Sequence, residues 1–117
     1  MAHWVLGNAA DGIHLDVNEN SSNGAVSGTL TVDGLNFSVS GLWTADGSLP
    51  GRNVSNINLR GSAASPNAPG APVFVALSGQ ISFNNGNPNI TGMSVGVYTA
   101  SSNTGALVSK LSQLSPA

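Results

Sequence analysis

Apolar and polar residues alternate with a period of two along most of the chain, and clusters of Gly, Asn, Asp and Ser interrupt the alternation at short intervals. This pattern is typical of an all-β meander, in which each strand buries one face and exposes the other. Strands are expected at residues 3–7, 12–19, 25–32, 35–44, 53–61, 72–83, 90–99 and 106–111. A short helix capped by Thr104 is the alternative for the last segment.

The strands at residues 25–32 and 35–44 are predicted to form a hairpin. The pair Asp33-Gly34 joins them, and such a pair suits a two-residue turn in which both central positions need positive φ. Residues 26–41 resemble residues 77–92, which predicts a second, similar hairpin. The face expected inside carries Val26, Gly28, Leu30, Val32, Phe37, Val39, Gly41, Trp43, Val73, Val75, Leu77, Gly79, Ile81 and Phe83. The opposite face is polar without charge and carries Ser27, Thr29, Thr31, Ser38, Ser40, Ser78, Gln80 and Ser82.

Closure of the sheet is indicated by glycines that recur at inward positions in the middle of strands. Glycine weakens a strand, so its repetition there favours kinks where the sheet coils tightly. A closed barrel also has no edges, which a sheet with so few charges would otherwise leave unprotected. We therefore expect a single domain over residues 1–117, an eight-stranded antiparallel up-and-down barrel, with a β-sandwich as the alternative.

Composition narrows the range of partners. Charged residues are 7% of the 117 residues and the net charge is −2, so the chain lacks the basic patch that binds nucleic acid. Its longest apolar run, residues 71–77, is far shorter than the ~20 residues that cross a membrane. Neutral polar residues in place of Lys and Glu are unusual for a cytosolic protein. We expect a secreted or periplasmic protein whose signal sequence is not part of this chain.

The order of several motifs resembles the avidin and streptavidin family. A strand with Trp4 is followed by GIHLDV, GAVSGTL, FSVSGLW and VALSGQI. The resemblance implies an eight-stranded avidin-like barrel that binds a small ligand at its open mouth, near Trp4, Trp43 and Tyr98. Asn8 is the candidate for an early ligand-binding Asn of that family.

The residues that would bind biotin are largely replaced. Leu77 stands where the family has Trp, and aliphatic residues stand where it has an inward Tyr, Ser or Thr: Leu30, Val32, Val73 and Val75. Because these replacements leave the ureido group without hydrogen-bond partners, we expect biotin to bind weakly or not at all. An elongated apolar ligand with one polar end would suit such walls better. The predicted ligand site is therefore Trp4, Asn8, Trp43, Leu77 and Tyr98.

Catalysis and metal binding have little support in the sequence. His14 and Asp16 share the outward face of the second strand, but no Gly-x-Ser-x-Gly elbow supplies a nucleophile. A metal site at His3, His14 and Asp16 would need a further firm ligand and supporting hydrogen bonds. We expect a non-enzymatic protein without a cofactor or a metal ion, and place Arg52 and Arg60 at the surface or at the closure of the barrel.

Self-association is predicted from the strand at residues 90–99. With Ile90 pointing inward, strict alternation puts Met93, Val95 and Val97 on the outside, where an apolar stripe would be buried between subunits of a dimer or tetramer. A secreted adhesion, structural or glycan-binding module is the alternative to the small-ligand barrel. A hollow barrel would favour the ligand-binding hypothesis, and a filled core would favour the alternative.

Overall fold

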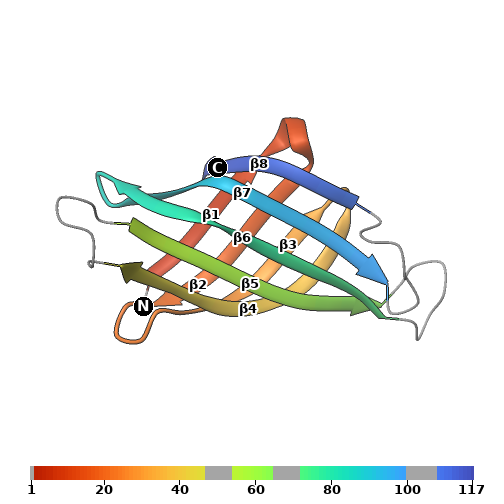
Figure 1. Ribbon diagram of the computed structural model, residues 1–117, viewed down its shortest axis with the longest axis horizontal. Helices are drawn as coiled ribbons and strands as arrows, with labels where there is room; N and C mark the ends of the chain where they lie inside the picture. Colours follow the sequence, from red (N-terminus) through yellow and green to blue (C-terminus); the bar gives the residue numbers. More distant parts are fainter. Residues whose placement is uncertain (1, 47–53, 65–71, 100–107) are drawn as a thin grey trace.

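The fold is a closed antiparallel barrel in which each strand pairs with the next and β8 returns to β1 (Figure 1). The computed structural model describes residues 2–46, 54–64, 72–99 and 108–117. The strands are β1 (Ala2–Asn8), β2 (Ile13–Asn20), β3 (Ala25–Val32), β4 (Leu35–Asp46), β5 (Val54–Ala64), β6 (Pro72–Asn84), β7 (Asn87–Thr99) and β8 (Val108–Pro116). The predicted all-β, eight-stranded up-and-down barrel is confirmed.

Most strand positions agree with the alternation pattern, and the differences lie at the ends. β7 begins at Asn87, earlier than expected, and a 3-10 turn, η1 (Ala9–Asp11), precedes β2. The last segment is the strand β8 rather than a helix, and its proposed cap, Thr104, lies outside the described residues. The part of the chain that the structure describes contains no helix long and apolar enough to span a membrane.

Both predicted hairpins are present and have the same turn chemistry. Asp33 and Gly34 have φ values of 50° and 83°, and Asn85 and Gly86 have φ values of 52° and 82°. Positive φ at both central positions gives the turn a twist that matches the flanking strands. Each turn joins two strands in register: Val32 lies opposite Leu35 in the first hairpin, and Asn84 lies opposite Asn87 in the second.

The inward side chains fill the barrel. Buried hydrophobic residues from all eight strands form one cluster, in which Leu15, Val17, Leu30, Val32, Ile57 and Ile90 have no exposed surface. An eight-stranded barrel is just wide enough for its side chains to fill. The expected inward face is confirmed except at Phe83, which is 45% exposed because it lies at the end of β6. The serines and threonines of the opposite face lie outside.

A β-bulge in β7 overturns the predicted subunit interface. Gly79 of β6 lies between the pairs Ser78–Ser94 and Gln80–Thr91, so it faces two residues of β7, Gly92 and Met93. Gly92 has a φ of 56°, in the left-handed region, where an extra residue can be accommodated. The bulge shifts the alternation by one position, so the next three apolar side chains of β7 turn into the core.

The expectation that Met93, Val95 and Val97 face outward is therefore wrong. Each of them is 1% exposed in the single chain. They belong to the barrel core and are not available for a contact between subunits. Strict alternation from Ile90 missed this because it assumes a regular strand.

The barrel is closed by a short seam between β1 and β8. Only two residue pairs join these strands, Leu6–Pro116 and Gly7–Ser115, and the Ala117 N–H donates to the Val5 carbonyl at 3.0 Å. Side chains extend the seam toward the other end of β8. Asn8 donates to the Gln113 carbonyl at 3.0 Å, and the Lys110 ammonium donates to the Asp11 carbonyl at 2.6 Å and to Asp33 Oδ1 at 2.8 Å.

Candidate functional site

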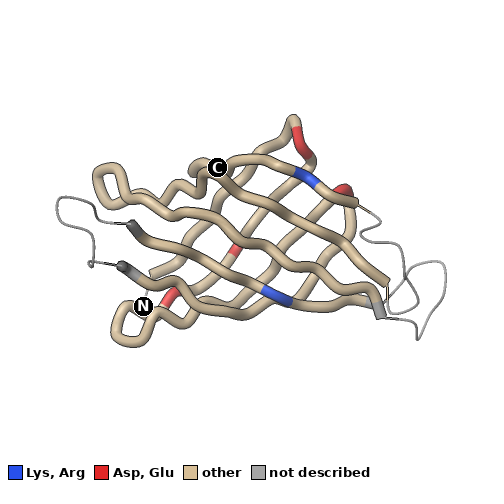
Figure 2. Tube along the Cα trace, viewed as in Figure 1, with Lys and Arg blue, Asp and Glu red and all other residues tan. Residues whose placement is uncertain are grey.

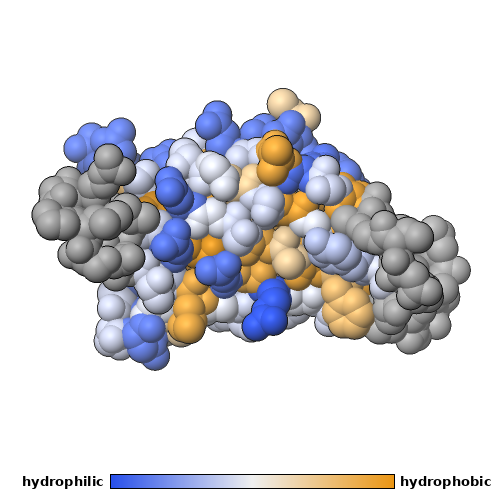
Figure 3. Space-filling model, viewed as in Figure 1, coloured by the Kyte–Doolittle hydropathy of each residue, from blue (hydrophilic) through white to orange (hydrophobic). Residues whose placement is uncertain are grey.

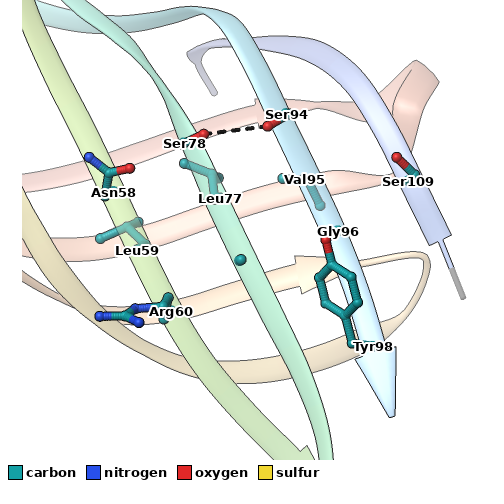
Figure 4. A pocket seen from close by; sticks show the side chains of 11 residues that line it. Asn58, Leu59, Arg60, Leu77, Ser78, Ser94, Val95, Gly96, Tyr98 and Ser109 are labelled. Atoms are coloured by element: carbon teal, nitrogen blue, oxygen red, sulfur yellow. Dashed lines mark hydrogen bonds between the residues drawn. The ribbon is translucent and has the colours of Figure 1, made fainter. Parts of the chain in front are cut away.

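A depression on the outside of the barrel lies over β5, β6, β7 and the start of β8. We call it the outer groove. It encloses about 560 Å³ and is lined by Asn58, Leu59, Arg60, Ala76, Leu77, Ser78, Ser94, Val95, Gly96, Tyr98 and Ser109 (Figure 4). Its volume falls within the range of small-ligand sites. Figure 3 views the face that carries this groove and shows hydrophilic side chains standing around apolar hollows.

Strand register assembles the outer groove from two rows of outward residues. The first row crosses the sheet through Asn58, Ser78 and Ser94, which are directly opposite one another. The second row contains Arg60, Ala76, Gly96 and Ser109. Ala76 and Gly96, in the middle of the second row, have small side chains and form the floor of the groove. The larger side chains around them form its walls.

Tyr98 forms one wall of the outer groove. It lies two residues beyond Gly96 on the same face of β7, and its ring folds back along the strand over Gly96 (Figure 4). A Cβ atom at position 96 would overlap the ring and hydroxyl of Tyr98, so this placement of the ring requires glycine there. Tyr98 is 40% exposed and lies opposite Phe74, which is also exposed. The groove therefore offers an accessible aromatic surface.

The polar groups of the outer groove are suited to hydrogen bonding. Ser78 Oγ and Ser94 Oγ are 3.4 Å apart, and the amide of Asn58 and the guanidinium of Arg60 lie along the opposite wall (Figure 4). Among the described residues, ion pairs are formed by His3 with Asp16 and by Lys110 with Asp33, and Arg60 is in neither pair. The groove combines one cation with hydroxyl, amide and aromatic groups. Such groups can form hydrogen bonds and ring contacts with a polar ligand.

A second depression lies beside the outer groove, over β4 and β5. We call it the side groove. It encloses about 400 Å³ and is lined by Ser40, Gly41, Leu42, Thr44, Asn58 and Arg60. Asn58 and Arg60 line both depressions. They form a ridge that separates two neighbouring hollows.

The residues predicted to bind a ligand do not come together in one place. Trp4 and Trp43 meet at the end of the barrel where β1 begins and β4 ends, with ring centroids 6.3 Å apart. Asn8 lies at the opposite end of β1, where its side chain caps η1. Leu77 and Tyr98 both line the outer groove, although Leu77 is buried and Tyr98 is exposed. Of the five, only the two tryptophans are in contact through their rings.

The two tryptophans are part of an aromatic cluster that covers one end of the core. Phe83 completes it, with ring centroids 5.7 Å from Trp4 and 5.5 Å from Trp43. Trp43 Nε1 donates to Glu19 Oε1 at 3.1 Å, and the hydroxyl of Ser21 donates to Glu19 Oε2 at 3.0 Å. Glu19 is 2% exposed. Sequence analysis did not single it out, although it continues the inward positions Ile13, Leu15 and Val17 of β2.

The remaining residues that the sequence singled out are the two histidines and Arg52. His3 Nε2 lies 2.6 Å from Asp16 Oδ1 on the exposed surface of the barrel, while His14 is an outward residue of β2. Among the described residues, no three His, Asp or Glu side chains form a group that could hold a metal ion. Arg52 lies outside the described residues.

No family model matches the chain, and neither a curated protein nor a solved structure matches it. The resemblance to the avidin family therefore stays a prediction. Sequence analysis also missed the outer groove, because its lining comes from separate strands that only the register brings together. The one hint of the groove in the sequence was Arg60, a charged residue that was expected at the surface.

Proposed function

We propose that this protein is a non-enzymatic, exported binding module that holds a carbohydrate in the outer groove. The observation that supports this proposal is the contrast between the two sides of the barrel wall. The interior is filled by apolar side chains, whereas the outer groove presents hydrogen-bonding groups beside an exposed aromatic ring. A ligand inside the barrel would first have to displace the core.

The groups of the outer groove match the chemistry of a sugar ring. Hydroxyl groups of a sugar both donate and accept hydrogen bonds, as do the Asn58 amide and the Ser78 and Ser94 hydroxyls. The apolar C–H face of a pyranose packs against an aromatic ring, and Tyr98 offers such a ring at the wall. Because the polar groups of the groove are exposed to solvent, we expect weak binding, with dissociation constants in the range of about 10 µM to 1 mM.

The proposal is tested by titrating the protein with a panel of neutral and acidic oligosaccharides in a calorimeter. Tyr98→Ala and Asn58→Ala are expected to weaken binding at least about tenfold by removing the aromatic wall and the amide. Ser27→Ala is the matched control, since Ser27 is an exposed residue of β3 outside the outer groove. If all three variants bound as the unmodified protein does, or if no sugar in the panel bound, the proposal would be wrong.

A further inference from the structure

Arg60 is placed where it can select the charge of the ligand. We infer, building on the proposed function, that the ligand is an acidic glycan whose carboxylate pairs with Arg60 and whose chain continues from the outer groove into the side groove. The inference names both a class of sugar, those with a uronic acid, and a minimum length, more than two rings.

The first argument is the charge of the face. The sequences of β5, β6 and β7 contain no Asp or Glu, and Arg60 is the only Lys or Arg within them. Figure 2 shows how thinly charged residues are spread over the barrel. Among the described residues that line the two grooves, Arg60 is also the one with a charge, so an incoming carboxylate would meet a single cation. Guanidinium binds carboxylate with two parallel hydrogen bonds, which a lysine cannot do.

The second argument is that four of the five Asp and Glu residues of the chain contact other groups. Asp33 pairs with Lys110 and Asp16 with His3, while Glu19 accepts from Trp43. Asp11 accepts a hydrogen bond from the side chain of Asn8. Among the described residues, none of these carboxylates forms an ion pair with Arg60. Its guanidinium is thus available to an external acid.

The third argument is the continuity of the two grooves. Both contain Asn58 and Arg60, so a ligand on one side of this ridge meets the other hollow directly. Together the grooves cross five neighbouring strands, β4 to β8, whose spacing of about 4.8 Å makes the path roughly 19 Å long. A single sugar ring would leave one hollow empty, whereas a short chain would fill both.

A uronic acid fits this arrangement better than a denser polyanion. The chain has a net charge of −2 and its two grooves contain one arginine, so a second and third acidic group on a ligand would lie without a cation. A glycan with a single uronic acid among neutral rings places its one charge at the ridge and leaves hydroxyl groups for Asn58 and the serines. Sulfated and sialylated oligosaccharides are included in the test as competing acidic ligands.

The test compares sugars that differ only in charge. Tetramers that carry one galacturonate, glucuronate or mannuronate unit among neutral sugar rings are titrated beside their methyl esters, which keep the ring and lose the carboxylate charge. We expect the acids to bind about five- to tenfold more tightly than the esters, and raising sodium chloride from about 50 mM to about 500 mM to remove most of this difference. Arg60→Gln is expected to bring the ratio close to one without changing the binding of the esters.

Length is tested separately with dimers and tetramers of the best acidic sugar. Leu42→Ala changes only the side groove, so it should weaken binding of the tetramer about threefold or more and leave the dimer unchanged. Ser27→Ala serves as the control for both comparisons, and circular dichroism confirms that each variant is folded.

The outcomes separate the inference from the proposed function. Equal binding of acids and esters, tighter binding of the sulfated or sialylated sugars, or equal binding of dimers and tetramers would overturn the inference while the carbohydrate site stands. Loss of acid preference in Tyr98→Ala but not in Arg60→Gln would also overturn it. If no sugar bound, acidic or neutral, the proposed function itself would fail.

Discussion

Phe37 and Ser38 are neighbours in β4 that face opposite sides of the barrel wall. Phe37 is among the largest fully buried side chains, whereas Ser38 is exposed. Phe37→Ala should lower the free energy of unfolding by about 3–5 kcal/mol because it leaves a cavity in a packed core. Ser38→Ala should change it by less than about 0.5 kcal/mol. Urea denaturation measures both, and similar losses for the two variants would contradict the assignment of the faces.

Glu19 stabilises the aromatic cluster by accepting a hydrogen bond from the Trp43 indole. Glu19→Ala should lower the free energy of unfolding by about 1–3 kcal/mol and shift tryptophan emission, because the Nε1–H loses its partner. Glu19→Gln keeps an acceptor oxygen and should lose less. Asp16→Ala is the control, since the exposed pair of Asp16 with His3 contributes less than about 1 kcal/mol. An equal loss for Glu19→Ala and Asp16→Ala would show that the indole contact is not stabilising.

At the scale of single elements, the bulge of β7 depends on the backbone of Gly92. A Cβ atom at this position would have no neighbour within 4 Å, so a substitution there tests the conformation rather than the packing. Asn tolerates positive φ and should be nearly neutral, whereas the β-branched side chain of Gly92→Val should cost about 1–2 kcal/mol or more. Thermal unfolding of the two variants checks this. Equal stability would mean that the bulge does not require positive φ.

The same bulge shows how far an alternation pattern can predict an element. The Asp33-Gly34 hairpin and the strands around it were predictable because turn chemistry and period two act over a few neighbouring residues. The inward placement of Met93 was not predictable in this way. One additional residue at Gly92 reverses the phase of every later position, and nothing in strict alternation marks it.

At the scale of the whole molecule, closure relies on side chains as well as on strand pairing. Lys110 is the only lysine of the chain, and it links β8 to the η1 carbonyl of Asp11 and to the turn at Asp33. Lys110→Met should lower the free energy of unfolding by about 1–2 kcal/mol, mostly through the lost bond to the carbonyl, because Asp33 is half exposed.

Hydrogen exchange locates the effect of this change. Backbone amides of β1 and β8 should exchange faster in Lys110→Met, while those of β4 and β5 should not change, because opening begins where the pairing is shortest. Arg60→Met provides a matched loss of a basic side chain away from the seam. Faster exchange throughout the barrel, or none at the seam, would contradict this account of closure.

The candidate site was less predictable than the fold because it exists only after the barrel closes. Asn58, Ala76 and Ser94 are each unremarkable outward residues in the sequence, and only the register of β5, β6 and β7 makes them neighbours. Tyr98 was predicted to contact a ligand at the mouth of the barrel, whereas it lines a depression on the outer face of the sheet. The outward direction of its side chain follows from the shifted phase of β7.

The filled interior of the barrel explains why biotin is expected to bind weakly or not at all. Leu30, Val32, Val73, Val75 and Leu77 all point inward and are buried, so they line the core with methyl groups where a ureido ring would need polar partners. Each ureido group buried without a partner would cost about 1–3 kcal/mol, and entry of the ring would also displace packed side chains.

Titration with biotin, followed by tryptophan fluorescence and by calorimetry, should therefore show no binding below millimolar concentrations. Trp4 and Trp43 lie at one end of the core, where their emission would report a ligand that entered beside them. Glu19→Ala is the informative variant, because it loosens the aromatic cluster without adding polar groups to the walls. A sub-micromolar dissociation constant for either protein would mean that the core opens to expose polar groups, and the interior would then replace the outer groove as the candidate binding site.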